Sequence, residues 1–371
     1  MRITFPHMGF LYIPVEAFLQ ELGHDVVVAP PMTKRTLELG TAHAPEVACL
    51  PLKVMIGSFL EAKELGADTV LMLGGTGPCR LGYYAEVQRQ ILAELGTAMD
   101  VLVVEPPLAN PARFWRDMRL LLGRRPGSLP RALRIAWEKL KACEGLEQLA
   151  LAVRPREKTP GQASTMVAEF QRRIRRAASV GSIRSAFKEG RAALAEACSP
   201  EKRPDLRIGI VGEIYTVLEP FVNLQLEERL GRLGVETVRT ISVAQWIEDH
   251  VVKASIGLYR ASQLKRSAAG YLRGWIGGHG LESVARTRDL ARAGVHGVVH
   301  ILPFTCMPEV MAQAILERAA RDWDIPVISL VVDEHTGEGG FQTRLEAFVD
   351  LIRRSERRGA VDEWKRSISR H

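Results

Sequence analysis

The stretch TVLMLGGTGPCR, residues 69–80, decides the fold class of this 371-residue chain. Residues 69–73 form a continuous apolar run, which is typical of a parallel strand that is covered on both faces. The glycines and the proline that follow predict a tight loop, and residues 81–95 have the spacing of a helix. A strand, a tight loop and a helix in this order predict one unit of an open α/β sheet.

The same alternation extends in both directions from this unit. We expect other strands at residues 3–5, 25–29, 101–104, 207–211, 236–240, 297–302 and 326–331. We expect helices at residues 15–22, 52–65, 221–233, 281–293, 307–320 and 341–352. No internal repeat of fixed period is present. The predicted fold class is therefore α/β, with two doubly wound (Rossmann- or flavodoxin-like) parallel-sheet domains and a helical basic section between them.

The section at residues 111–203 loses the strand pattern and is rich in basic side chains. Residues 110–203 hold 21 Lys and Arg against 9 Asp and Glu, a surplus of 12 in a chain of net charge +7. Helical spacing covers residues 113–122, 129–151 and 165–198. We interpret the section as a solvated helical face, with an acidic partner or a phosphate-bearing ligand as the alternative. Nucleic acid is not expected, because no binding motif or interleaved aromatic pattern is present.

These patterns predict a domain organisation. We expect an N-terminal α/β domain at 1–110, the basic helical section at 111–203, a C-terminal α/β domain at 204–355 and a polar tail at 356–371. The composition, 46% hydrophobic and 25% charged, is typical of globular proteins. No apolar run approaches the ~20 residues of a membrane span. The first residues lack a signal-peptide pattern, so a cytoplasmic protein is expected.

The five cysteines are an odd number, which argues against a secreted disulfide framework. Cys49, Cys79 and Cys306 each stand in a proline-flanked loop before a predicted helix, and the last two follow a strand. A helix N-terminus should lower the pKa of such a thiol and favour the thiolate, the form that binds soft metals. The alternative is that free cysteines pack as small hydrophobic residues, which we assign to Cys143 and Cys198.

The three loop cysteines predict a metal site at the sheet edge. Structural zinc needs four Cys or His ligands, so a distant residue such as His7 or His335 would have to join them. An iron–sulfur cubane accepts three thiolates and one open iron. Gly75 and Gly77 would let the backbone approach a bulky cofactor. We therefore expect an iron–sulfur cluster, with a zinc-bound or thiol-dependent enzyme as an alternative.

Residues 333–340 (DEHTGEGG) form a second candidate motif between a strand and a helix. Glu334 and His335 could position a substrate or move a proton. An equally weighted alternative is a capping loop whose acids complement the helix dipole. Arg344, in the first turn of that helix, could bind a carboxylate or phosphate, or pair with Glu346.

Several of these segments together resemble the activase-related branch of the 2-hydroxyacyl-CoA dehydratase family. The similar stretches are residues 47–84, residues 303–308 (PFTCMP) and residues 333–348. The resemblance implies a [4Fe-4S] cluster held by Cys49, Cys79 and Cys306. It also implies low-potential electrons from a separate ATP-dependent activase, and an acyl-CoA substrate.

Two features of the sequence differ from the family pattern and limit the function that the resemblance implies. The chain lacks the Asp-x-Gly-Ser-Thr phosphate loop of the activase, so we do not expect it to be the ATPase. A double-cubane cluster with six thiolates requires a homo- or heterodimer, because one chain holds five cysteines. The expected function is an iron–sulfur redox protein of anaerobic metabolism. The alternative is a non-catalytic scaffold or maturation partner with the same fold.

Overall fold

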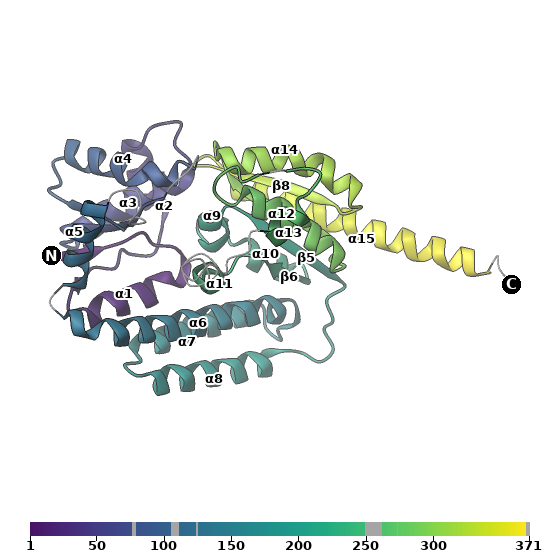
Figure 1. Ribbon diagram of the computed structural model, residues 1–371. Helices are drawn as coiled ribbons and strands as arrows, with labels where there is room; N and C mark the ends of the chain where they lie inside the picture. The colour runs from purple at the N-terminus through teal and green to yellow at the C-terminus, as the bar shows by residue number, and fades with distance from the viewer. Residues whose placement is uncertain (76–78, 105–110, 124, 249–261, 273, 369–371) are drawn as a thin grey trace.

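The computed structural model describes residues 1–75, 79–104, 111–123, 125–248, 262–272 and 274–368. In these residues the strands form two four-stranded, all-parallel sheets with the orders β2-β1-β3-β4 and β6-β5-β7-β8 (Figure 1). The strands are β1 (Arg2–Thr4), β2 (Asp25–Val26), β3 (Thr69–Leu73), β4 (Asp100–Val104), β5 (Leu206–Gly212), β6 (Val235–Arg239), β7 (Gly297–Pro303) and β8 (Val327–Val332). The two sheets have the same strand order, and the predicted doubly wound α/β fold is confirmed.

Helices cover both faces of the first sheet. Leu19 and Leu121 pack against Ile3 on one face, and Phe59 and Leu92 belong to the apolar cluster on the other. These side chains come from α1 (Tyr12–Glu21), α5 (Pro111–Leu122), α3 (Leu50–Glu64) and α4 (Leu81–Glu94), respectively. The sequence did not predict α2 (Lys34–His43), which packs on α3.

The basic section is a helical layer beside α1 (Figure 1). Its first helix, α5, packs on the first sheet, and the layer consists of α6 (Leu129–Val153), α7 (Gln162–Arg176) and α8 (Val180–Ala197). The single helix predicted at residues 165–198 is two helices, because Ser179 caps a new one by accepting from the Ser182 N–H (3.1 Å). Some of the basic side chains of this section form ion pairs, such as that between Arg175 and Glu16 (2.6 Å).

The second sheet is also covered on both faces. Leu290 and Ala320 pack on one face, and Leu230 and Leu345 belong to the cluster on the other. The helices of the second half are α9 (Ile214–Leu218), α10 (Leu226–Arg232), α11 (Val243–Ile247), α12 (Ser262–Ser267), α13 (Gly280–Arg292), α14 (Met307–Asp322) and α15 (Glu338–Ile368). Short 3₁₀ turns lie earlier in the chain, at Gly9–Leu11, Pro126–Ser128 and Arg154–Arg156.

The last helix is longer than predicted. The sequence predicted an end near residue 352 and a frayed tail, but α15 continues to Ile368 and projects from the body (Figure 1). That prediction was wrong, because arginine, glutamate and alanine are strong helix formers and no proline interrupts them. None of the helices in the described parts of the chain is long and apolar enough to cross a membrane.

The two halves share one apolar core. Val70 of the first sheet and Ile208 of the second belong to a single cluster of buried side chains. The loops at the carboxyl ends of the two sheets are also in contact. The Tyr215 hydroxyl, after β5, donates to the carbonyl of His7, after β1 (2.7 Å).

A buried ion-pair network fixes the helical layer to the second sheet. The side chain of Arg239, at the end of β6, is only 2% exposed and contacts Glu147 of α6 (3.2 Å) and Glu227 of α10 (3.1 Å). Burial raises the pKa of Glu147, so the arginine offsets only part of the cost of removing this carboxylate from water.

Replacing Arg239 by methionine tests this network. We expect Arg239→Met to lower the free energy of unfolding by about 3–5 kcal/mol, because buried carboxylates lose their counter-charge. Arg232→Met, which removes an exposed pair with Glu228, should cost at most about 0.5 kcal/mol. Urea denaturation measures both values. A cost for Arg239→Met equal to that of the control would contradict the network's role.

Candidate functional site

Three cysteines lie at the starts of helices where the two halves meet. Cys49 directly precedes α3, Cys306 directly precedes α14, and Cys79 lies two residues before α4. Cys49 and Cys306 are buried, whereas Cys79 is half-buried. A proline in the first turn of α3 and of α14 fixes the direction in which each helix leaves its cysteine.

The loops that carry the three cysteines are joined by hydrogen bonds. The Cys49 sulfur is hydrogen-bonded to the hydroxyl of Tyr84. Burial raises the pKa of Tyr84, and the charges of Cys49 and Cys79 raise it further. The Thr305 hydroxyl, directly before Cys306, donates to the carbonyl of Val47, two residues before Cys49 (3.1 Å). The loops of Cys49 and Cys306 are therefore in contact between the halves.

Burial raises the pKa of all three thiols. The pKa of Cys49 is raised to about 11, and the pKa values of Cys79 and Cys306 are also raised. The sequence analysis expected helix N-termini to lower these values, and that expectation was wrong for the metal-free chain. The loss of water outweighs the favourable backbone N–H groups. A soft metal that bound these sulfurs would therefore have to displace their protons.

Glu213, directly after β5, is a site residue that no sequence motif indicated. Its carboxylate caps α9 by accepting from the N–H groups of Tyr215 (3.0 Å) and Thr216 (2.8 Å). Burial is the largest cause of the raised pKa of each of the three cysteines, and the negative charge of Glu213 raises these pKa values further. Gly212 brings it there: its φ is +146°, and a Cβ would lie 1.9 Å from the carbonyl oxygen of Ile301.

A glycine loop borders Cys79 from the second half of the chain. A Cβ at Gly278 would lie 3.7 Å from the Cys79 sulfur and 3.3 Å from Cγ of Pro308. A Cβ at Gly280 would lie 2.6 Å from the carbonyl oxygen of Pro308. The glycines at residues 277, 278 and 280 are the sequence signal that could have indicated this close approach.

A buried hydrogen-bonded chain runs behind Cys306. His300 of β7 and Glu309 of α14 are fully buried, with 2.9 Å between Nε2 and Oε2. The Ser283 hydroxyl donates to the same carboxylate oxygen (2.8 Å), and the Ser329 hydroxyl lies 3.1 Å from His300 Nδ1. The other oxygen of Glu309, Oε1, has no hydrogen-bond partner among the described residues. A buried oxygen in this state indicates a position for a further polar group.

The acidic loop after β8 joins the two halves. The carboxylate of Glu334 forms an ion pair with Lys53 of α3, whose side chain is 4% exposed. His335 is 86% exposed, with its ring 4.0 Å from the same carboxylate. Asp333 accepts hydrogen bonds from the Thr336 hydroxyl (2.7 Å) and the His335 N–H (3.0 Å). The proton-transfer role of Glu334 and His335 stays a prediction.

The remaining candidates occupy different places. Gly75 packs on Gly82 of α4, where a Cβ would lie 2.5 Å from the carbonyl oxygen of Gly75. Gly77 lies outside the described residues. Arg344 donates to the carbonyl of Ser329, within β8 (2.8 Å).

The chemistry of the three cysteines suits a thiolate-bound group. In the described ranges, no group of three or more His, Cys, Asp or Glu side chains is placed so that it could hold one metal ion. Thiolates bound to different irons of a cluster stand farther apart than thiolates on one ion, and the donor set is three soft sulfurs. The backbone of Gly278 also approaches Cys79 closely, since a Cβ there would lie 3.7 Å from the Cys79 sulfur.

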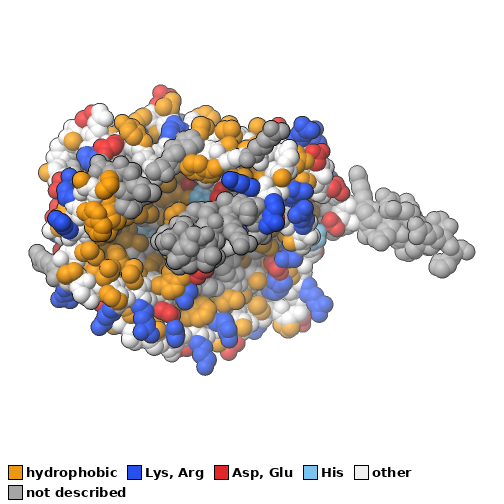
Figure 2. Space-filling model, viewed as in Figure 1, with side chains coloured by type: hydrophobic (Ala, Val, Ile, Leu, Met, Phe, Trp, Pro, Cys, Tyr) orange, Lys and Arg blue, Asp and Glu red, His pale blue; other side chains and the backbone are white. Residues whose placement is uncertain are grey.

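Exposed hydrophobic side chains surround the cysteines. Val47 is 68% exposed, Tyr83 67% and Phe304 59%, and each lies within four residues of one of the three cysteines. Figure 2 shows hydrophobic side chains along the upper rim of this face, near where α4 and α14 approach each other in Figure 1. Such clustering is typical of a surface that meets another molecule.

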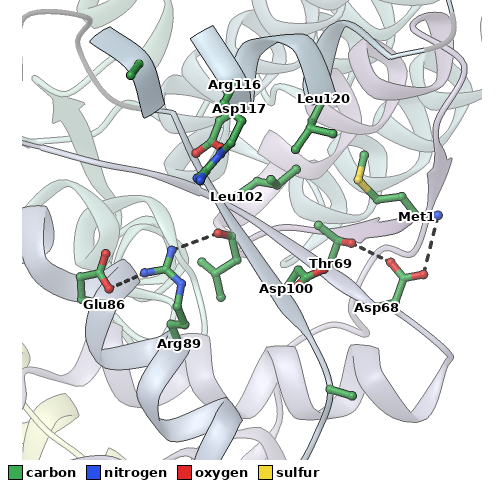
Figure 3. Close-up of a pocket in the computed structure, with 13 residues that line it drawn as sticks. Met1, Asp68, Thr69, Glu86, Arg89, Asp100, Leu102, Arg116, Asp117 and Leu120 are labelled. Carbon is green, nitrogen blue, oxygen red and sulfur yellow. Dashed lines mark hydrogen bonds and ion pairs between the residues drawn. The ribbon is translucent and has the colours of Figure 1, made fainter. Parts of the chain in front are cut away.

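A cavity of about 1140 Å³ lies elsewhere, along the outer edge of β4 (Figure 3). It is lined by Asp100 and Leu102 of β4, Arg89 of α4 and Asp117 of α5, among others. Arg89 donates to the carbonyl of Val101 (3.1 Å) and so covers part of this strand edge. Ligands of open parallel sheets bind at the carboxyl edge, and no cysteine lines this cavity. The three-cysteine region is therefore the candidate site.

Comparison with known proteins finds a similarity in the N-terminal part of the chain. Residues 7–72 match a family model described as "CoA enzyme activase uncharacterised domain". These residues are similar to that domain, in line with the predicted resemblance. The match includes Cys49 and ends within β3, before Cys79 and Cys306. No curated protein matches the chain. The relation to a particular dehydratase stays a prediction.

The raised pKa of Cys49 predicts an unusual pH dependence of alkylation in the metal-free protein. Between pH 8 and pH 10 the thiolate fraction should rise about 90-fold in the folded chain, against about fourfold for an ordinary cysteine. Iodoacetamide labelling, followed by peptide mass spectrometry, measures the rate at Cys49. The urea-unfolded chain is the control. The same pH profile in both states would contradict the raised pKa.

The Lys53–Glu334 pair predicts a non-additive double variant. Glu334→Gln leaves the buried ammonium of Lys53 without a counter-charge and should lower the free energy of unfolding by about 3 kcal/mol. Adding Lys53→Met should restore most of this loss, because both charges are then absent. His335→Gln is the exposed control and should change stability by less than about 0.5 kcal/mol. If the effects of Glu334→Gln and Lys53→Met on the free energy of unfolding simply add in the double variant, the ion pair does not stabilise the contact between the two halves.

Proposed function

We propose that this chain is an iron–sulfur redox protein in which Cys49, Cys79 and Cys306 hold a [4Fe-4S]-type cluster. The observation that carries the proposal is the grouping of three thiols, two from the first half and one from the second, around one region. Three thiolates leave one iron of a cubane open. When bound, such a cluster accepts and passes on single electrons.

Helix N-termini support an anionic, thiolate-bound group at this position. The helices α3, α4 and α14 have 15, 14 and 16 residues, long enough for a full dipole at each start. A backbone N–H at the beginning of each helix also lowers the pKa of its cysteine, against the larger effect of burial. The donors are Leu52 for Cys49, Leu81 for Cys79 and Glu309 for Cys306. Hydrogen bonds to the sulfurs tune the reduction potential of a cluster.

The surroundings of the thiols suit electron transfer. Cys49 and Cys306 are buried, which keeps water away from two of the sulfurs. Cys79 is half-buried, so an electron donor would approach from its side. The Tyr84 hydroxyl, bonded to Cys49, is placed to donate to that sulfur once the thiol has lost its proton.

The partners follow from the family relation. We propose an ATP-dependent activase as the electron donor and a CoA-thioester dehydratase or reductase as the reaction system. The match of residues 7–72 to the CoA enzyme activase family supports this context. An acyl-CoA substrate at the open iron and a dimeric assembly belong to the same proposal.

A non-catalytic interaction partner is the second candidate, favoured by the exposed Val47, Tyr83 and Phe304 beside the site. A zinc-bound enzyme has less support. His7 is bonded to Glu219 (3.3 Å), and His335 is 86% exposed, so neither is held as a fourth ligand.

Single cysteine variants test the ligand assignment. Cys49→Ala, Cys79→Ala and Cys306→Ala should each lose most of the broad visible absorbance of a cluster when the protein is prepared without oxygen. Cys143→Ala is the matched control: this thiol is also buried but lies in the helical layer, and the absorbance should be kept. Retention of absorbance in all three site variants would contradict the assignment.

A further inference from the structure

One arginine binds all three cysteine-bearing loops. Arg80 directly follows Cys79, and its Nη1 donates to the carbonyl of Val47, two residues before Cys49 (3.0 Å). Its Nη2 donates to the carbonyl of Thr305 and to the Thr305 hydroxyl (3.0 Å), directly before Cys306. The three contacts join loops that are 33 and 225 residues apart in the chain.

Thr305 closes this arrangement from the other side. Its hydroxyl donates to the same Val47 carbonyl (3.1 Å), so Val47, Arg80 and Thr305 form a ring of hydrogen bonds. The φ of Thr305 is +65°, a left-handed conformation that is rare for a β-branched residue. A conformation of this kind persists only where the surroundings hold it, and it marks sites whose geometry is functionally constrained.

We propose that Arg80 is the positioning residue of the three-cysteine site: it sets the spacing of the three sulfurs before any metal arrives. The proposal rests on the proposed function for the identity of the ligand, whereas the contacts involve this chain alone. The hydrogen bonds of Arg80 go to the carbonyls of Val47 and Thr305 and to the Thr305 hydroxyl. Arg80 therefore acts through the loops and not as a ligand.

The role requires the shape of a guanidinium. A planar fork reaches two carbonyls on separate loops at once, whereas a lysine ammonium is a single point charge on a flexible stem. The positive charge also counters the rise in the pKa of Cys49 and of Cys79 that burial causes. Arg80→Lys keeps the charge and removes the fork, so it separates the two effects.

Bifunctional alkylation of the metal-free protein tests the proposal. Dibromobimane becomes fluorescent when its two arms alkylate neighbouring thiols, and peptide mass spectrometry identifies the pair. Wild type should give links among Cys49, Cys79 and Cys306. Arg80→Gln and Arg80→Lys should each lower the yield about tenfold, the scale on which groups that orient ligands act.

Two further variants keep the test falsifiable. Thr305→Val removes the hydroxyl without a change of charge and should also lower the yield, even if Arg80→Gln does not fold. Arg89→Gln is the matched control: Arg89 lies on α4, which Arg80 directly precedes, but it is bonded to Glu86 and to the Val101 carbonyl, so this variant should cross-link as wild type does. Thermal unfolding of each variant shows whether the fold is retained. A lower cross-linking yield counts for the proposal only in a variant that unfolds at the same temperature as wild type.

The outcomes distinguish this proposal from the proposed function. If wild type cross-links, the variants do not, and no chain takes up iron and sulfide, the cluster proposal fails and the positioning role stands. Equal yields in folded wild type, Arg80→Lys and Thr305→Val overturn the positioning role, whatever the iron content. Absence of any link among the three cysteines in wild type also overturns it.

Discussion

The apolar core shared by the two sheets holds their carboxyl edges against each other. Phe59 of the first half and Ile208 of the second lie in one buried cluster, so the halves cannot separate without exposing it to water. The contact between the edges is polar, as in the bond from Tyr215 to the carbonyl of His7. Burial of the shared apolar core therefore holds the halves together, and the hydrogen bonds between the polar loops set how the two edges are positioned.

This arrangement turns two equivalent sheets into one site. β3 and β7 occupy the same place in the two strand orders, and Cys79 follows one while Cys306 follows the other. Cys49 joins them from the start of α3. A site divided in this way exists only while the halves are in contact, which explains why Arg80 and Lys53 both reach across the boundary.

Two opposing effects act on the cysteines. Helix N-termini favour the thiolate, but burial disfavours any charge, and burial is the larger effect in the metal-free chain. Protonated, buried thiols react slowly with oxidants, so the site is protected before it is loaded. A bound metal would place a positive charge beside the sulfurs, which offsets the cost of burying a thiolate and makes deprotonation favourable. Under the proposed function, the same sulfurs would be inert when free and strong ligands once metal is present.

Much of this architecture was predictable from local sequence. All eight strands were expected, because short apolar runs between turn residues identify buried parallel strands. The short α9 was not expected, because it depends on the cap that Glu213 supplies. The length of α15 was underestimated, although its charged residues and alanines are strong helix formers. Cys79 and Cys306 were candidates because both follow strands. Arg80 and Gly278 were not, because their roles come from contacts between distant segments that no local pattern records.

The central claim is that three thiols from both halves hold one iron–sulfur cluster. Iron, zinc and acid-labile sulfide per chain, measured on protein prepared without oxygen, test it most directly. The account predicts about four iron and about four sulfide per chain, with no stoichiometric zinc. One zinc per chain without sulfide, or no metal at all after reconstitution with iron and sulfide, would contradict it.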